Sequence, residues 1–224
     1  MGIITIDESH QVVATLVVNT AWETIDFNNS GLQDFIIRNP KEAGRQFTAF
    51  LKNGGKFTFK ESTKMIIDRA KPFNPAEFIG SDWNVWRGPK DGNGLEGEEE
   101  QDGGALVLTE VDIGMIRLEN MLKPGETSVN GEEKLRRLEK AGHTRLDAKV
   151  LQTLWENQYL IPEKWKEKTN GQATYIFFDG TVLRYSSGDR YVLYLYWDGG
   201  EWRRSCGWLD SNWHANDPSA VLAN

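Results

Sequence analysis

Cysteine, histidine and long apolar runs are scarce in this sequence, and each scarcity excludes a class of protein. The one cysteine, Cys206, rules out an internal disulfide and any zinc site that needs paired cysteines. The three histidines form no HxxxH or HExxH pattern, so a zinc hydrolase is not expected. No run approaches the ~18 consecutive apolar residues of a membrane-spanning helix. We therefore expect no metal, no cofactor and no membrane span.

Motifs for phosphate binding and acyl transfer are missing as well. The run NGGK at 53–56 lacks the spacing and the Ser or Thr of a P-loop, and GxSxG is absent. Only Asp91 and Asn93 fit the first ligand positions of a calcium-binding loop. Cys206 and His214 have no orienting Asn or Asp in a known catalytic pattern. The sequence therefore predicts a protein without enzymatic activity.

Positive charge is outnumbered, since 26 Lys and Arg residues face 33 Asp and Glu residues for a net charge of -7. Binding to a nucleic-acid backbone relies on clustered Lys and Arg, so no nucleic-acid partner is expected. The first residues, MGIITIDESH, lack the basic-then-apolar layout of a signal peptide. We expect a chain that is cytoplasmic as synthesised, and display at a surface by another route stays open.

Hydrophobic patterning predicts helices first and a succession of strands afterwards, an order that favours an α+β fold. The early part shows a β-branched strand at 12–18 and a helix from 39 to 53, capped by Asn39-Pro40 and ended by Gly54-Gly55. The elements predicted later are a strand at 105–111, helices at 132–141 and 145–157, a hairpin turning at Asp179-Gly180, a turn at 186–189, a long strand at 190–197 and a closing strand at 218–223.

Composition divides the chain into regions. Residues 1–75 form an N-terminal region of unknown role, and residues 76–224 form the main domain. Within that domain, residues 88–104 are acidic and rich in glycine, which predicts an exposed loop or linker. The segment 197–217 differs from the rest because of its tryptophans.

Four tryptophans recur every five or six residues in this segment: Trp197, Trp202, Trp208 and Trp213. Large aromatic side chains bury much area and hold their position, whereas small polar side chains adapt to a partner. We expect all four tryptophans to point inward and the residues between them to face a ligand. The candidate ligand-binding positions are Asp198, Glu201, Arg203, Arg204, Ser205, Cys206, Gly207, Asp210, Ser211, Asn212, His214, Asn216 and Asp217.

The segment WDGGEWRRSCGWLDSNWHANDPSAVLA resembles the variable region of the target proteins of diversity-generating retroelements. Those systems copy a template RNA back into the gene and replace adenines at random. The resemblance implies that template AAC codons yield residues such as Asp, His, Ser, Gly, Arg and Cys, but never Lys, Gln, Met, Glu or Trp. Only Glu201 among the positions between the tryptophans falls outside the accessible set. Tryptophan codons contain no adenine and would persist as a constant frame.

The same resemblance implies a C-type lectin-like fold for residues 76–224, with the variable residues facing solvent. It covers the C-terminal strands well, the helical part loosely and residues 1–75 hardly at all. The GFR-type closing strand of that fold is replaced here by PSAVLA. The implied function is a hypervariable, receptor-like protein that binds an unknown protein or surface ligand.

Two other functions stay open at this point. A carbohydrate-binding module would stack two or more exposed, coplanar tryptophans on sugar rings, whereas the variable-surface hypothesis wants those side chains buried. An enzyme of the formylglycine-generating type shares the related fold but uses paired active-site cysteines, and this chain has one.

Overall fold

The computed structural model describes residues 64–223 together with Lys41, Gly44, Arg45, Phe47, Thr48 and Lys52. The chain divides into two compact units, Met1–Lys60 and Glu61–Asn224. The strand predicted at 12–18 and most of the helix predicted from 39 onward lie outside the described residues.

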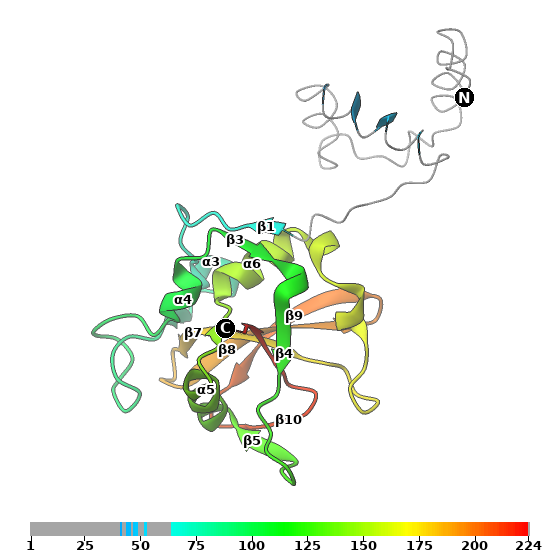
Figure 1. Ribbon diagram of the computed structural model, residues 1–224. Coiled ribbons are helices and arrows are strands. Elements are labelled where there is room, and N and C mark those ends of the chain that lie inside the picture. Colours follow the sequence, from blue (N-terminus) through cyan, green and yellow to red (C-terminus); the bar gives the residue numbers. More distant parts are fainter. Residues whose placement is uncertain (1–40, 42–43, 46, 49–51, 53–63, 224) are drawn as a thin grey trace, which may run out of the picture. The chain divides into compact units, whose positions relative to one another are not determined.

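The second unit is an α+β structure built on a seven-stranded, mostly antiparallel sheet (Figure 1). Its main path runs β4-β11-β7-β8-β9, while β2 pairs with β7 and β6 pairs with β11. Strand β9 therefore lies at an edge, and the C-terminal strand β11 lies inside the sheet. The strands are β2 (Trp83–Val85), β4 (Ile116–Glu119), β6 (Thr144–Arg145), β7 (Ile176–Tyr185), β8 (Arg190–Asp198), β9 (Glu201–Trp208) and β11 (Ser219–Leu222).

Two small antiparallel sheets and four short helices complete the described part of the unit. The helices are α3 (Pro75–Phe78), α4 (Gly103–Leu106), α5 (Gly131–Lys140) and α6 (Ala148–Glu156), and the 3-10 turns are η3 (Ile113–Met115), η4 (Gln158–Leu160) and η5 (Glu163–Lys166). One small sheet pairs β1 (Lys64–Ile66) with β3 (Glu110–Asp112), and the other pairs β5 (Ser128–Asn130) with β10 (Asn212–His214). Figure 1 shows these two pairs at opposite ends of the unit.

Apolar side chains fill both sides of the main sheet because neighbouring residues of a strand point to opposite faces. On one side, Phe178 and Leu195 pack with Leu151 and Leu154 of α6 in the larger core cluster. On the other side, Phe177 belongs to a second cluster that includes Trp213 and Leu135 of α5. The strand β7 is thus buried on both faces, and it holds the two cores together.

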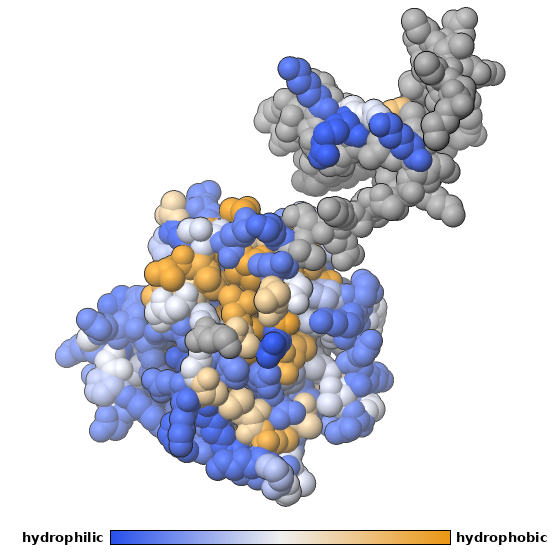
Figure 2. Space-filling view, viewed as in Figure 1, coloured by the Kyte–Doolittle hydropathy of each residue, from blue (hydrophilic) through white to orange (hydrophobic). Residues whose placement is uncertain are grey.

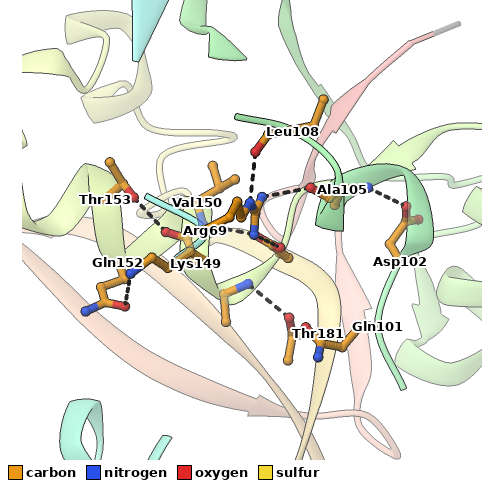
Figure 3. Close-up of polar contacts among 12 residues, drawn as sticks. Arg69, Gln101, Asp102, Ala105, Leu108, Lys149, Val150, Gln152, Thr153 and Thr181 are labelled. Atoms are coloured by element: carbon orange, nitrogen blue, oxygen red, sulfur yellow. Dashed lines mark hydrogen bonds and ion pairs between the residues drawn. The ribbon is translucent and has the colours of Figure 1, made fainter. Parts of the chain in front are cut away.

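Arg69 ties the segment after β1 to the rest of the unit. Its guanidinium donates to the carbonyl oxygens of Leu108 (2.8 Å) and Ala105 (2.7 Å) and pairs with the buried Asp147 (2.5 Å). Asp147 in turn caps α6 by accepting from the backbone N–H of Val150 (2.9 Å). Figure 3 shows the bonds to Leu108 and Ala105 converging on the Arg69 guanidinium. The compact unit consequently begins earlier in the chain than the boundary expected after residue 75.

The hairpin turn predicted at Asp179-Gly180 is wrong. These residues lie inside the continuous strand β7, at an irregularity in its pairing with β8 between Phe178 and Leu183. The Gly180 N–H donates to the Leu146 carbonyl (3.0 Å), and a Cβ on Gly180 would lie 2.1 Å from a neighbouring carbonyl oxygen. The glycine is there for close backbone approach, and an Asp-Gly pair in a strand marks a bulge as readily as a turn.

The strand predicted at 105–111 is also wrong. Residues 103–106 form α4, because Asp102 caps that helix by accepting from the Ala105 N–H (3.0 Å), and pairing begins only at Glu110 in β3. Helix α6 starts at Ala148 rather than at 145, since Arg145 pairs with β11. The predicted helix at 132–141, the turn at 186–189, the long strand at 190–197 and the closing strand are confirmed.

The acidic loop 88–104 is anchored to the domain at several points. Glu100 forms two hydrogen bonds with the Arg190 guanidinium (2.6 and 2.7 Å), which also stacks over the Trp86 ring at 4.7 Å. Gly94 lies so close to Trp86 that a Cβ there would meet the indole at 2.5 Å. Residues 88–102 therefore form a loop folded back on the sheet, residues 103 and 104 begin α4, and the segment does not link two domains.

Apolar side chains are also exposed on this unit. Figure 2 shows them gathered over the end where β1 and β3 lie. Ile66 on β1 and Met115 in η3 are 67% and 64% exposed. The candidate positions between the tryptophans lie elsewhere, at the end of β8, on β9 and β10 and in the turns that follow these two strands.

Candidate ligand-binding surface on strands β9 and β10

Strand β9 distributes the candidate positions over two faces. Its register with β8 places Arg203 opposite Tyr196 and Ser205 opposite Tyr194. Directly paired residues of antiparallel strands point to the same side. We call this side, made of Tyr175, Tyr194, Tyr196, Arg203 and Ser205, the tyrosine face. Trp202, Arg204, Cys206 and Trp208 point to the opposite side of β9.

The tyrosine face combines rigid rings with exposed polar groups. The ring of Tyr175 lies 5.4 Å from that of Tyr194 and 5.2 Å from that of Tyr196, measured between centroids. Burial raises the pKa of the Tyr194 phenol, which is hydrogen-bonded to Ser205. Arg203 is exposed and pairs with Asp198 (3.5 Å) and Glu201 (2.8 Å), both of which are exposed too. Such a mixture of fixed aromatic and adaptable polar groups suits recognition of a partner.

Strand β10 repeats the alternation around a single buried tryptophan. The Trp213 ring stacks on Phe177 with centroids 4.1 Å apart and is 3% exposed. Its neighbours Asn212 and His214 are exposed on the other side of the strand. The His214 ring nitrogen Nδ1 lies 3.1 Å from the carbonyl oxygen of Thr127. Polar side chains at this end can therefore change without altering the packing of the indole.

The thirteen candidate positions are not equally accessible. The exposed ones are Asp198, Glu201, Arg203, Ser205, Asp210, Asn212 and His214, and the partly buried ones are Arg204, Cys206, Gly207, Ser211 and Asp217. Asn216 is buried and donates to the Ala173 carbonyl (3.1 Å). At Gly207 a Cβ would lie 2.4 Å from the Phe177 ring, so a side chain there requires that ring to move.

The four tryptophans do not all point inward. Trp202 and Trp213 are buried, and Trp197 is half-buried with its ring 5.4 Å from that of Trp202. The inward orientation predicted for Trp208 is wrong, because this side chain is 43% exposed. Trp208 is the last residue of an edge strand, so one flank of it has no neighbouring strand in the described sheet.

A buried lysine beneath this region was not anticipated from the sequence. Lys134 of α5 donates to the Asp217 carbonyl oxygen, and its ammonium lies 4.8 Å from the Trp213 ring centroid. Burial lowers the pKa of Lys134 to about 8, although the charges of Asp179 and Asp217 act against the shift. A signal was present, since Lys134 shares a helix face with the buried Gly131 and Leu138.

Cys206 lies on the opposite side from the tyrosine face and is partly buried. Burial raises the pKa of its thiol to about 12. A cysteine nucleophile needs a lowered pKa, so this thiol is poorly suited to attack at neutral pH.

Two further features concern residues 64–223 and the few described residues before them. None of their helices is long and apolar enough to cross a membrane. No three side chains among His, Cys, Asp and Glu in that part of the chain lie where they could share a metal ion.

No protein-family model, no curated protein and no solved structure matches this chain. Its function is therefore inferred from the geometry of the described residues and from the sequence pattern.

Proposed function

We propose that the protein binds a macromolecular ligand through replaceable residues that β9 and β10 display on a fixed frame. The observation that carries this proposal is the alternation of burial. Trp202 and Trp213 are 5% and 3% exposed, whereas the adjacent Arg203, Asn212 and His214 are exposed. Exposed side chains are usually replaced at a cost within about ±0.5 kcal/mol, so this surface tolerates exchange.

The resemblance to retroelement target proteins would explain why buried and exposed residues alternate in this segment. Adenine-directed replacement needs positions whose side chains do not support the core. Arg203, Ser205, Asp210, Asn212 and His214 meet that requirement by exposure. Gly207 and Asn216 meet it less well, since one contacts Phe177 closely and the other is buried.

A C-type lectin-like arrangement is part of the same proposal. Helices α5 and α6 precede the strands β7, β8 and β9 in the chain. The C-terminal strand β11 then returns to pair with β4 and β7. This order and the return of the last strand support the proposal and are compatible with other α+β folds.

The carbohydrate-binding alternative is less well supported. A stacking platform needs exposed rings in one plane, but the planes of Trp197 and Trp202 are inclined by 70° and Trp202 is buried. Trp208 is the one tryptophan of the segment that is well exposed. A formylglycine-generating activity is disfavoured by the single cysteine, whose thiol has a raised pKa.

The proposal is tested by the DNA beside the gene and by a library. An imperfect repeat of codons 197–223 that differs only at adenines, near a reverse transcriptase gene, is the expected finding. In the laboratory, a displayed library with AAC-derived codons at the five exposed positions should retain folded protein in most clones. A matched library at the buried positions Trp202, Leu195, Leu193, Leu209 and Trp213 should lose it. Similar losses of folded protein in both libraries would contradict the proposal.

A further inference from the structure

A cavity of about 370 Å³ opens on the side of β9 that faces away from the tyrosine face. It lies between the end of α3, marked by Phe78, and the side chains of Leu193 and Cys206 on β8 and β9. Cavities that hold small molecules start at roughly 300 Å³ and have apolar and aromatic linings with a few polar groups. Of the five exposed positions of the proposed recognition surface, Ser205 alone borders this cavity.

Three aromatic side chains form one wall of the cavity. The Trp83 ring lies 4.8 Å from the Tyr185 ring and 5.1 Å from the Tyr191 ring, with interplanar angles of 48° and 80°. All three side chains are half-buried. Because each ring contacts the others, the wall is held in place before any ligand arrives, which reduces the entropy lost on binding.

Arg204 supplies a fixed cation at the rim. Its guanidinium carbon lies 3.7 Å from the Phe78 ring centroid and 4.4 Å from that of Trp155, so the group is held between two rings. One of its N–H groups donates to the Phe78 carbonyl oxygen (2.9 Å). An arginine has five N–H donors, so most of the fork stays available to a ligand.

This cation has no anionic partner within the part of the chain that the structure describes. Its neighbour Arg203 pairs with Asp198 and Glu201, whereas no carboxylate pairs with Arg204. Burial lowers the pKa of Arg204, as expected for a charge that is not compensated. A partly desolvated guanidinium binds a carboxylate strongly, with two parallel hydrogen bonds.

The remaining groups around the cavity are neutral. Burial raises the pKa of the Cys206 thiol to about 12 and also raises that of the Tyr191 phenol. Asp189 lies near enough to Tyr191 to affect its pKa, but its carboxylate accepts from the Ser187 hydroxyl (2.5 Å) and does not line the cavity. The cavity therefore combines an aromatic wall, an apolar floor and one positive charge.

We propose that this cavity binds a small aromatic carboxylate, whose ring lies against Trp83 and Tyr191 and whose carboxylate pairs with Arg204. The inference is independent of diversification of the segment. If positions 204 and 206 do vary, the constant aromatic wall would still bind the ring of the ligand. The residues at these two positions would then determine which polar group of the ligand is preferred.

Calorimetric titration of the full chain with indole-3-acetate and with its neutral counterpart indole-3-acetamide tests the proposal. We expect the acetate to bind at least about tenfold more tightly, because hydrogen bonds to a charged group contribute about 1.5–3 kcal/mol. Arg204→Gln should remove this preference. The control Arg203→Gln, on the tyrosine face, should leave both affinities unchanged. Equal affinities of the two compounds for the wild type, or equal effects of the two variants, would overturn the proposal.

Cys206 reports where the probe binds, because it is the one cysteine of the chain and lines the cavity. Saturating indole-3-acetate should slow its alkylation at pH 8.5 at least about fivefold, as expected when a bound ring covers a partly buried thiol. Indole-3-acetamide at the same concentration should slow it less. This measurement uses the wild type alone, so it decides the question even if Arg204→Gln fails to fold. Binding of the acetate without protection of Cys206 would place the site elsewhere and contradict the proposal.

Discussion

The two sides of strand β9 differ in what holds their side chains, although they alternate along one short sequence. Arg203, on the tyrosine face, is exposed and paired with two exposed carboxylates. Arg204, one residue later, is held between Phe78 and Trp155 and bonded to a carbonyl. Two adjacent arginines thus have unlike environments because side chains of a strand alternate with a period of two. Composition describes this segment well, but its position in the sheet decides what each residue does.

The largest expected effect separates the buried tryptophans from the exposed one. Trp213→Ala should lower the free energy of unfolding by about 3–5 kcal/mol, since it removes a buried indole stacked on Phe177. Trp208→Ala should cost less than about 1.5 kcal/mol because this side chain is 43% exposed. Urea unfolding of both variants and the wild type measures the difference. Equal losses of unfolding free energy in the two variants would mean that Trp208 supports the core as much as Trp213 does.

A smaller effect is expected within β9 itself. Gly207→Val should lower the free energy of unfolding by about 1–3 kcal/mol, because its side chain must displace the Phe177 ring. The control Ser205→Val, two residues earlier on the same face, should change it by about 0.5 kcal/mol or less. Thermal melts at matched concentration compare the pair. A Gly207 variant as stable as the Ser205 variant would show that position 207 is as replaceable as its neighbours.

The buried lysine predicts a dependence of stability on pH. The pKa of Lys134 falls from 10.5 to about 8 in the folded protein. Between these values the unfolded chain binds more protons than the folded one. Stability should therefore rise with pH in that window, by up to about 1.4 kcal/mol per pH unit. Below about pH 8 both states bind the proton, and the cost of the buried ammonium is fully present.

Lys134→Met is the matched control for this prediction, because it removes the titrating group from the buried site. The unfolding free energy of the wild type should rise relative to that of this variant as pH rises from 8 to 10. Cys206, whose raised pKa has the opposite effect above pH 9, is present in both proteins and cancels in the comparison. A difference that stays constant over the range would show that Lys134 does not lose its proton early.

The smallest effect should come from the displayed positions. Replacing Arg203, Ser205, Asn212 and His214 by serine or asparagine should change the free energy of unfolding by about 0.5 kcal/mol or less at each position. Arg204→Ser should cost more, because it removes the guanidinium from between two rings. Unfolding of the single variants in guanidinium chloride measures these differences. A loss at Arg203 as large as that at Arg204 would mean that the two faces are supported alike.

Local patterns in the sequence predicted several elements correctly. The helix at 132–141, the long strand at 190–197 and the turn at 186–189 were all found. These features depend on hydrophobic periodicity and turn chemistry, which act between residues close in the chain. The prediction failed at Asp179-Gly180 and at 105–111, where contacts with distant residues decide the conformation. Gly180 bonds to Leu146, and Asp102 both caps α4 and pairs with Arg145.

In the candidate site, too, some features follow from the local sequence and others from contacts between distant residues. The tryptophan spacing by itself located a segment in which Trp202 and Trp213 are buried and their neighbours are exposed. The spacing did not determine that Trp208 is exposed, because this exposure follows from the position of β9 at the edge of the sheet.

The sequence by itself determined the α+β composition, the helix α5, the long strand β8, the closing strand β11 and the spacing of the tryptophans in 197–217. Only the tertiary structure decided that Lys134 is buried under Trp213, that Gly207 contacts Phe177 and that Arg204 faces a cavity. Each of these contacts joins residues far apart in the chain. Periodicity records which face of an element is apolar, but only the pairing of strands and the packing of helices determine which distant residue covers that face.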